Sequence, residues 1–255
     1  MFIRRNKTYS KGCQSNRVFF VSVFCMIVGI LVRLFYCVLY PVQPRDAYVY
    51  GAVISQLKET GKIPAHVSYY PLSLWILKIP HQLFNYDSIK GGIIVNMLLG
   101  LLIIAIVVYF ISRYFKNIFS LIFVGLLAAT HPSLVRFSCS CLRENSYLFF
   151  FLLVLMLLSS YSSGGGKLFS IVLAGIFGAC AFLCRLEGLE IVGIVFIVMF
   201  IFFLSKRLGL SKAACHFCVF LIVFSVTAFS IYYFLGARKV SQELIMSKID
   251  FESLN

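Results

Sequence analysis

Acidic residues are scarce in this 255-residue sequence: Asp and Glu together number 9, and none precedes Asp46. Charged residues of both signs make up only 13% of the chain, whereas hydrophobic residues make up 61% and the mean hydropathy is +0.95. Several apolar runs reach or approach the roughly 20 residues that a helix needs to cross about 30 Å of hydrocarbon. The composition therefore excludes an ordinary water-soluble domain and predicts an all-α polytopic membrane protein.

Metal-binding and redox patterns are also missing. No set of Cys and His residues has the spacing of zinc ligands, and most of the 9 cysteines lie inside apolar runs, where they act as small hydrophobic residues. We therefore predict no disulfide framework, no metal and no other cofactor. The net charge of +14 does not indicate nucleic-acid binding, because the cations lie in short segments beside the apolar runs, where membrane proteins encode their orientation.

Seven apolar segments are predicted to span the membrane, and the first of them follows a basic segment, residues 1–17. That first span is too long for the apolar part of a signal peptide and lacks a cleavage site of small residues, so we expect a retained anchor. A further segment, 71–84, would be only about 21 Å long as a helix. Because it also contains Lys78 and Pro80, it is predicted to lie in the membrane interface, with Trp75 at the headgroup level. The predicted spans are 18–40, 91–112, 118–135, 146–161, 168–184, 189–204 and 213–235.

Charge placement predicts the orientation of these spans. With the N-terminus in the cytoplasm and 71–84 in the interface, the inner segments contain only cations and all 9 acids fall on the outer side. If 71–84 crossed the membrane, the basic turns would face outward, against the positive-inside rule. We therefore predict seven spans with the N-terminus inside and the C-terminus outside. The predicted parts are a cytoplasmic basic head (1–17), a transmembrane module (18–235) with a long external loop (41–90) that contains interfacial helices, and a short external tail (236–255).

Three polar clusters fall at the outer ends of the predicted spans, and each contains an arginine and a carboxylate. A carboxylate can act as a base on a hydroxyl or amine while arginines hold a lipid phosphate, so a reaction between such groups at a membrane surface needs both. Solvated anchoring charges and structural ion pairs are the alternative for each cluster taken alone. Arg33, inside the first span, either reaches outward to the interface or contacts a lipid phosphate. The clusters are Arg45, Asp46, Tyr48 and Tyr50; Arg136, Arg143 and Glu144; and Arg185 and Glu187.

The order of these features resembles the GT-C-type glycosyltransferases that use polyprenyl-phosphate sugars, especially the dolichyl-phosphate-mannose protein mannosyltransferases and the aminoarabinose transferases of lipid A. That family has an aspartate motif with a downstream tyrosine in the first external loop, similar to residues 45–50, and then an aromatic-Pro-Leu element, similar to residues 69–72. An arginine with an acid opens the fourth span, as Arg143 and Glu144 do here. A later turn of the type L-x-R-x-E-G-L is similar to residues 183–189.

The resemblance implies a membrane glycosyltransferase that moves a sugar from a polyprenyl-phosphate donor to a lipid, glycan or protein acceptor. The reaction would occur on the outer face of a bacterial cytoplasmic membrane, or on the lumenal face of the endoplasmic reticulum in a eukaryote. By position, Asp46 would be the general base on an acceptor hydroxyl or amine. Members of this branch are largely metal-independent, and the single acid of the Asp46 motif, where many members have two, agrees with that. The residues that would line or shape the substrate cavity are Arg143, Glu144, Arg185, Glu187, Tyr48, Tyr69 and Tyr70.

A non-catalytic lipid-binding or partner subunit is the alternative function, because complete family members usually continue with further spans and this chain ends after the seventh. A second membrane protein would then supply the missing part. A small transporter is less favoured, since most spans are uninterrupted, the charges lie at the span ends and no internal repeat is visible.

Overall fold

The computed structural model describes residues 11–61, 71–163, 167–205 and 208–235, in which all regular structure is helical and no strand occurs. The predicted all-α fold class is therefore confirmed. The helices are α1 (Lys11–Leu39), α2 (Arg45–Thr60), α3 (Pro71–Phe84), α4 (Ser88–Ser112), α5 (Ile118–Thr130), α6 (Pro132–Ser138), α7 (Glu144–Ser163), α8 (Leu168–Cys184), the 3-10 helix η2 (Leu186–Leu189), α9 (Glu190–Leu204) and α10 (Leu210–Phe234).

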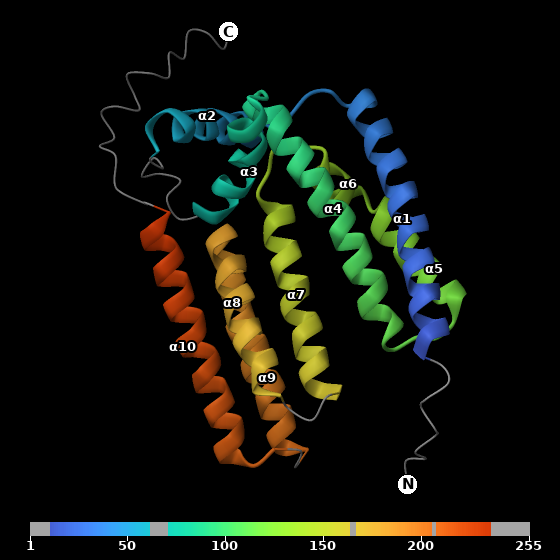
Figure 1. Cartoon of the computed structure of the whole chain (residues 1–255), viewed down its shortest axis with the longest axis vertical. Coiled ribbons are helices and arrows are strands. Elements are labelled where there is room, and N and C mark those ends of the chain that lie inside the picture. Colours follow the sequence, from blue (N-terminus) through green and yellow to red (C-terminus); the bar gives the residue numbers. More distant parts are fainter. Residues whose placement is uncertain (1–10, 62–70, 164–166, 206–207, 236–255) are drawn as a thin grey trace.

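Five helical segments of the described part are long and apolar enough to cross a membrane, and one bent pair adds a sixth candidate span. The five are α1, α4, α7, η2 with α9, and α10; the bent pair is α5 with α6, and the 17-residue helix α8 is apolar but shorter. α1 begins and α10 ends at opposite ends of the bundle (Figure 1). The chain is thus a polytopic all-α membrane protein, and seven crossings with the N-terminus inside stay predictions.

The third predicted span, 118–135, differs from a continuous helix. α5 ends at Thr130, and α6 begins at Pro132 after a bend of 53°. Proline lacks the N–H that would continue the hydrogen bonds of α5, and it disfavours helical dihedrals in the residue before it. His131 accordingly has φ −56° and ψ 122°, and its N–H closes α5 on the carbonyl of Leu127 at 2.9 Å. The bend leaves carbonyls in the last turn of α5 available to donors from other helices.

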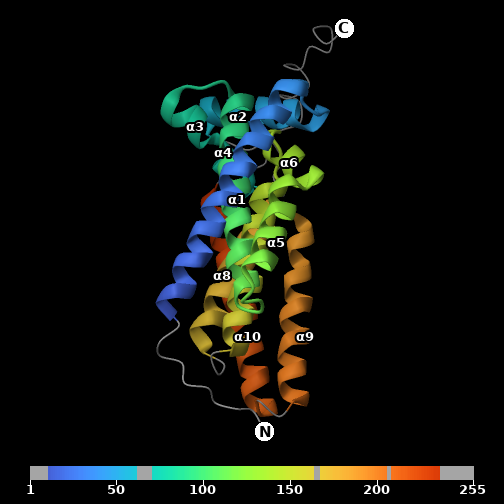
Figure 2. The same ribbon diagram turned by 90° about the vertical axis from the view of Figure 1, so that its right-hand side faces the viewer.

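Helices α2 and α3 lie across one end of the bundle, as both perpendicular views show (Figures 1 and 2). The bounds of α3 are those of the segment predicted not to span, and α3 is not among the candidate spans of the described residues. Lys78 donates to the carbonyl of Leu57 at the end of α2 (3.3 Å), and Trp75 Nε1 donates to the carbonyl of Leu235 after α10 (3.3 Å). α3 therefore satisfies carbonyls at the C-terminal ends of two other helices. Burial lowers the pKa of Lys78, whose Nζ also lies 4.4 Å from the centre of the Trp75 ring.

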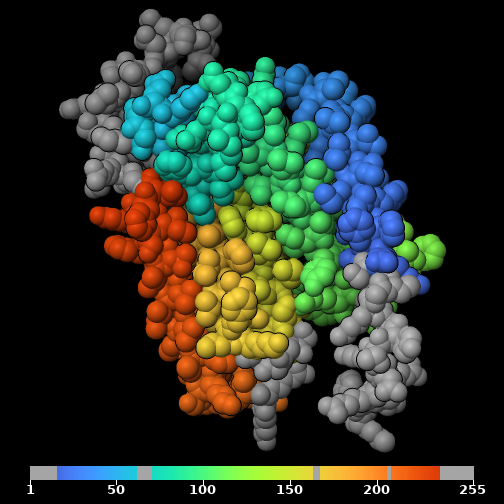
Figure 3. Space-filling view, in the orientation of Figure 1, coloured from blue at the N-terminus to red at the C-terminus, as the bar shows by residue number. Residues whose placement is uncertain are grey.

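Three apolar cores hold this arrangement together. One joins α1, α4 and α5, and a second joins α7, α8, α9 and α10. The third lies at the end of the bundle, where the buried faces of α2 and α3 pack on Cys141 and Leu142, in the turn between α6 and α7. In the space-filling view, α2 and α3 form a continuous layer above the ends of α8 and α10, while α1 and α4 rise beside it (Figure 3). The layer therefore rests on the turn that precedes Arg143 and Glu144.

The contact between α4 and α6 depends on Gly100, and this gives a testable prediction. A Cβ atom at Gly100 would overlap Ser138 Oγ and lie 3.2 Å from Arg33 Nε. We expect Gly100→Ala to destabilise the protein by about 1–2 kcal/mol, because the clash outweighs the gain in helix propensity of roughly 1 kcal/mol. Gly193 on α9 is the matched control, since a Cβ there meets nothing within 4 Å. Thermal unfolding in detergent should show a lower Tm for Gly100→Ala and an unchanged or higher Tm for Gly193→Ala; equal values would contradict the predicted clash.

Candidate functional site

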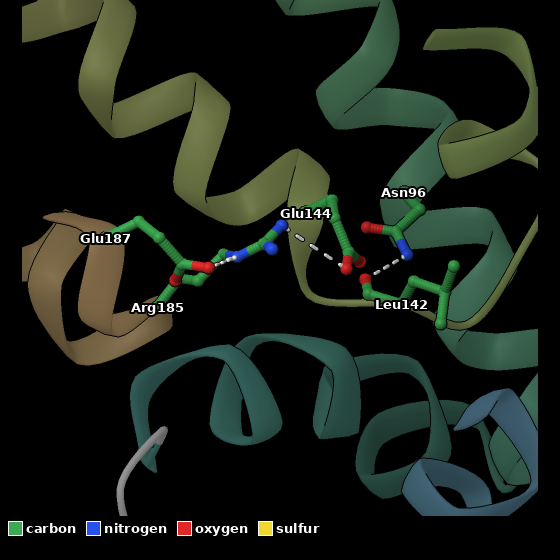
Figure 4. Close-up of polar contacts among 5 residues, drawn as sticks. All are labelled: Asn96, Leu142, Glu144, Arg185 and Glu187. Carbon is green, nitrogen blue, oxygen red and sulfur yellow. Dashed lines mark hydrogen bonds and ion pairs between the residues drawn. The ribbon is translucent and has the colours of Figure 1, made fainter. Parts of the chain in front are cut away.

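Arg185 joins two of the three predicted polar clusters. Its Nη1 lies 3.5 Å from Glu144 Oε1, and its Nε lies 2.9 Å from Glu187 Oε1 (Figure 4). Glu144 begins α7, whereas Glu187 lies in η2 between α8 and α9. The side chains of Arg185 and Glu144 are 31% and 20% exposed, so this ion pair is partly screened from solvent. The two clusters that are more than 40 residues apart in the sequence thus form one charged site.

The turn around Arg185 requires its glycine. Arg185 leaves the helical conformation with φ −161° and ψ 137°, while its N–H still donates to the carbonyl of Ala181 at 2.9 Å. The chain then folds back tightly, and the N–H of Gly188 donates to the carbonyl of Arg185 at 2.9 Å. A Cβ atom at Gly188 would overlap the backbone of Phe182. Only glycine fits this close approach, which directs Arg185 toward α7 and keeps Glu187 beside it.

Asn96, a fully buried residue of α4, holds the turn before Glu144. Its Nδ2 donates to the carbonyls of Ser140 (2.7 Å) and Leu142 (2.6 Å). Asn145, also buried, donates from Nδ2 to the carbonyl of Asn96 at 2.9 Å. These bonds attach both sides of Glu144 to α4. The position of Glu144 is therefore fixed by buried hydrogen bonds and not by its ion pair alone.

The helix that contains Asp46 approaches this site through Tyr50. The Tyr50 ring centre lies 5.9 Å from the guanidinium carbon of Arg143, within the range of a cation–π contact. Asp46 is one helical turn before Tyr50, about 6 Å along α2, so both residues share one face of that helix. Asp46 and Arg45 are exposed, and within the described ranges neither side chain forms a hydrogen bond or ion pair. Tyr48 is also exposed.

The remaining predicted site residues lie elsewhere or outside the described part. Arg136 is exposed on α6 and makes no ion pair within the described residues. Tyr69 and Tyr70 lie outside the described residues. The site thus brings together Tyr50, Arg143, Glu144, Arg185 and Glu187. Asp46 lies one turn of α2 before Tyr50 and forms no hydrogen bond or ion pair with these residues.

Arg33 does not reach outward to the interface. It is 1% exposed, and its Nη1 donates to the carbonyls of Gly29 (3.0 Å) and Ala129 (3.1 Å). Ala129 is in the last turn of α5, where the proline bend leaves carbonyls unpaired and where a positive charge is favoured by the helix dipole. Arg33 also lines an apolar groove between α1 and α4. It therefore caps α5 inside the bundle, and its contact with a lipid phosphate stays a prediction.

Asn96 was not predicted from the sequence as part of the site. Asn96 is the one polar residue in the middle of the apolar run 93–111, apart from Tyr109 near its end. A lone amide within a transmembrane helix is expected to bond to a neighbouring segment, because lipid offers it no partner. That signal points to a polar contact within the bundle but does not identify the partner residues.

The fold and the site define a polytopic membrane protein with a charged site at one end of its helices, the class to which GT-C-type glycosyltransferases belong. The sequence matches the dolichyl-phosphate-mannose-protein mannosyltransferase family over residues 66–233, more than half of the chain. The chain belongs to this family, and the resemblance predicted from its motifs is confirmed. No curated protein and no solved structure matches the sequence. The matched region contains Arg143, Glu144, Arg185 and Glu187, whereas Asp46 precedes it.

Proposed function

We propose that this protein transfers a sugar from a polyprenyl-phosphate donor to a hydroxyl or amine of a lipid, glycan or protein acceptor. The observation that carries the proposal is the convergence at Arg185 of two carboxylates from different helices, with Arg143 and Tyr50 beside them. Arginines beside a carboxylate at the end of a membrane bundle suit a substrate that combines a phosphate with hydroxyl groups. Family membership supports a membrane glycosyltransferase, and the donor and acceptor are part of the proposal.

In the proposed reaction, Asp46 removes a proton from the acceptor hydroxyl or amine. The acceptor atom then forms a bond to the anomeric carbon of the sugar, while the bond from that carbon to the phosphate oxygen breaks. The electron pair remains on the polyprenyl phosphate, and Arg143 and Arg185 stabilise its charge. Asp46 later loses the proton to water. Inversion at the anomeric carbon follows from this single displacement.

The other predicted residues have supporting roles in the proposal. Arg45 and Arg136, both exposed, would contact phosphate groups of the donor or of neighbouring lipids. The tyrosines Tyr48, Tyr50, Tyr69 and Tyr70 would shape the cavity. The site would face the periplasm in a bacterium or the lumen of the endoplasmic reticulum in a eukaryote, because the proposed orientation places α2 and α3 on the outer side.

Direct assay of the purified protein tests the proposal. The protein in nanodiscs is incubated with short-chain polyprenyl phosphates that carry labelled mannose or aminoarabinose, together with hydroxyl- and amine-bearing acceptors. We expect the label to move to an acceptor and polyprenyl phosphate to be released in equal amount. Transfer only after a second membrane protein is added would instead assign this chain a partner role. No transfer under either condition would contradict the proposed function.

A further inference from the structure

The amide oxygen of Asn96 is a buried acceptor that the described chain leaves without a donor. Both hydrogens of Asn96 Nδ2 are used, because Nδ2 donates to the carbonyls of Ser140 and Leu142. These two bonds fix the amide orientation, so Oδ1 can only accept. Asn96 is fully buried, and Oδ1 has no hydrogen-bond partner among the described residues.

One oxygen of the Glu144 carboxylate also lacks a hydrogen-bond donor. Oε1 faces Arg185, whereas Oε2 is buried and has no hydrogen-bond partner within the described part of the chain. The free oxygen of Asn96 points toward this carboxylate (Figure 4). Leu142 and Asn145, on either side of Glu144 in the sequence, are both bonded to Asn96, which keeps the two residues close.

Two acceptors that face each other require a hydrogen between them. Buried acceptors without donors are unfavourable, so a group that donates hydrogen bonds is expected at this place. A metal cation is disfavoured because Arg185 already places a positive charge 3.5 Å from the Glu144 carboxylate. A neutral donor, such as a hydroxyl group, adds no charge and can donate to either oxygen.

We propose that Asn96 Oδ1 and Glu144 Oε2 form a subsite for a hydroxyl group of the substrate. The inference rests on the proposed function and deepens it, because it assigns two specific oxygens to recognition of a polyhydroxylated ligand. The hydroxyl belongs either to the sugar of the donor or to the acceptor, and these sources share the same hydrogen-bond chemistry. A neutral hydroxyl bound by a carboxylate and an amide oxygen is held more strongly than by two neutral acceptors.

Glu144→Gln tests the subsite. The new amide nitrogen can donate to Asn96 Oδ1 within the protein, so the pair no longer needs an external donor. We expect the Tm in detergent to be unchanged or higher, whereas affinity for a hydroxyl-bearing ligand falls about tenfold, the loss typical of one charge-assisted hydrogen bond. The probe is a labelled short-chain polyprenyl phosphate, with and without mannose, bound to the protein in nanodiscs. Glu190→Gln is the matched control, since Glu190 is an exposed acid of the same end of the bundle.

The source of the hydroxyl decides which measurement changes. If the sugar provides it, Glu144→Gln weakens binding of the mannose-linked lipid and leaves the bare polyprenyl phosphate unaffected. If the acceptor provides it, both lipids bind as before and only binding of the acceptor weakens, measured as its Kd in the same nanodiscs. Either result supports the subsite when Glu190→Gln shows neither effect.

The subsite is overturned if Glu144→Gln changes neither the preference for the mannose-linked lipid nor the Kd of the acceptor, whatever the Tm of the variant. The subsite is also overturned if Glu144→Gln weakens binding of the mannose-linked and the bare polyprenyl phosphate by the same factor. The loss would then come from the missing carboxylate charge and not from a hydroxyl of the sugar. Binding does not require turnover, so this test and the transfer assay can fail independently. If the wild-type protein prefers the mannose-linked lipid, loses this preference in Glu144→Gln and transfers no sugar, the subsite is supported and the proposed function is contradicted.

Discussion

Asp46→Asn is expected to reduce the rate of sugar transfer by about 10²–10⁴-fold, the contribution typical of a general base. Asparagine has nearly the same shape as aspartate but cannot take up the acceptor proton. The Tm should change little, because Asp46 is exposed and forms no hydrogen bond or ion pair with the described residues. Loss of a carboxylate from the first turn of α2 removes about 0.3–1 kcal/mol of interaction with the helix dipole. Transfer from the labelled donor and thermal unfolding are measured on the same preparation.

Glu59→Gln is the matched control for this experiment. Glu59 is an exposed acid near the other end of α2, so the substitution changes the helix charge equally without touching the proposed base. We expect Glu59→Gln to keep the wild-type transfer rate. A second variant, Arg45→Gln, separates a base from an ion partner: if Asp46 acts only by holding Arg45, both variants lose the same activity. Wild-type turnover by folded Asp46→Asn protein would refute the assignment of Asp46.

The short helix α3 shows what the sequence can predict about this fold. Its length, its internal Lys78 and Pro80, and the charge balance of the later loops indicated a helix that does not cross the membrane, and the observed bounds agree. These signals are local in the chain, so no partner has to be known. The long apolar helices are predictable for the same reason, because the thickness of a bilayer sets their length.

The angle of the bend at Pro132 and the hydrogen-bond partner of Arg33 could not be predicted from local sequence patterns. Proline in an apolar run indicates a kink or a helix end but does not give its angle, which depends on packing with α1 and α4. Arg33 bonds to the carbonyl of Ala129, 96 residues later, and the sequence gives no sign of that partner. Intramembrane arginines are correctly flagged as unusual, yet the choice between a helix cap and a lipid contact needs coordinates.

The candidate site could be predicted only in part from the sequence. Charge placement predicted that the clusters with Arg143 and Arg185 lie at the same end of the bundle, and the structure brings them together. The specific pairing of Arg185 with Glu144 could not be predicted, because several carboxylates share that end. Asn96 was missed as a site residue because its hydrogen bonds go to backbone carbonyls more than 40 residues later in the chain, and nothing local in the sequence identifies those partners.

Asn96→Ala is therefore expected to affect both stability and transfer. The variant removes two buried hydrogen bonds to the turn before Glu144 and leaves a small cavity, which should destabilise the protein by about 2–4 kcal/mol. Transfer at a temperature well below the lowered Tm should fall about 10²-fold, because displacement of a substrate-positioning group by roughly 1 Å has effects of that size. Thermal unfolding and the transfer assay measure the two losses separately.

Two further variants identify the cause of these losses. Asn96→Asp fills the same volume but places an oxygen against the Ser140 and Leu142 carbonyls, so it should destabilise at least as much as alanine if hydrogen bonds and not packing are responsible. Asn117 caps α5 at the opposite end of the bundle, where its side chain accepts from the N–H of Phe119 at 3.0 Å. Asn117→Ala should lose about 1 kcal/mol of stability, as expected for a helix cap, and keep the transfer rate. If folded Asn96→Ala also keeps that rate, the turn does not need α4 to present Glu144, and Asn96 is a structural residue only.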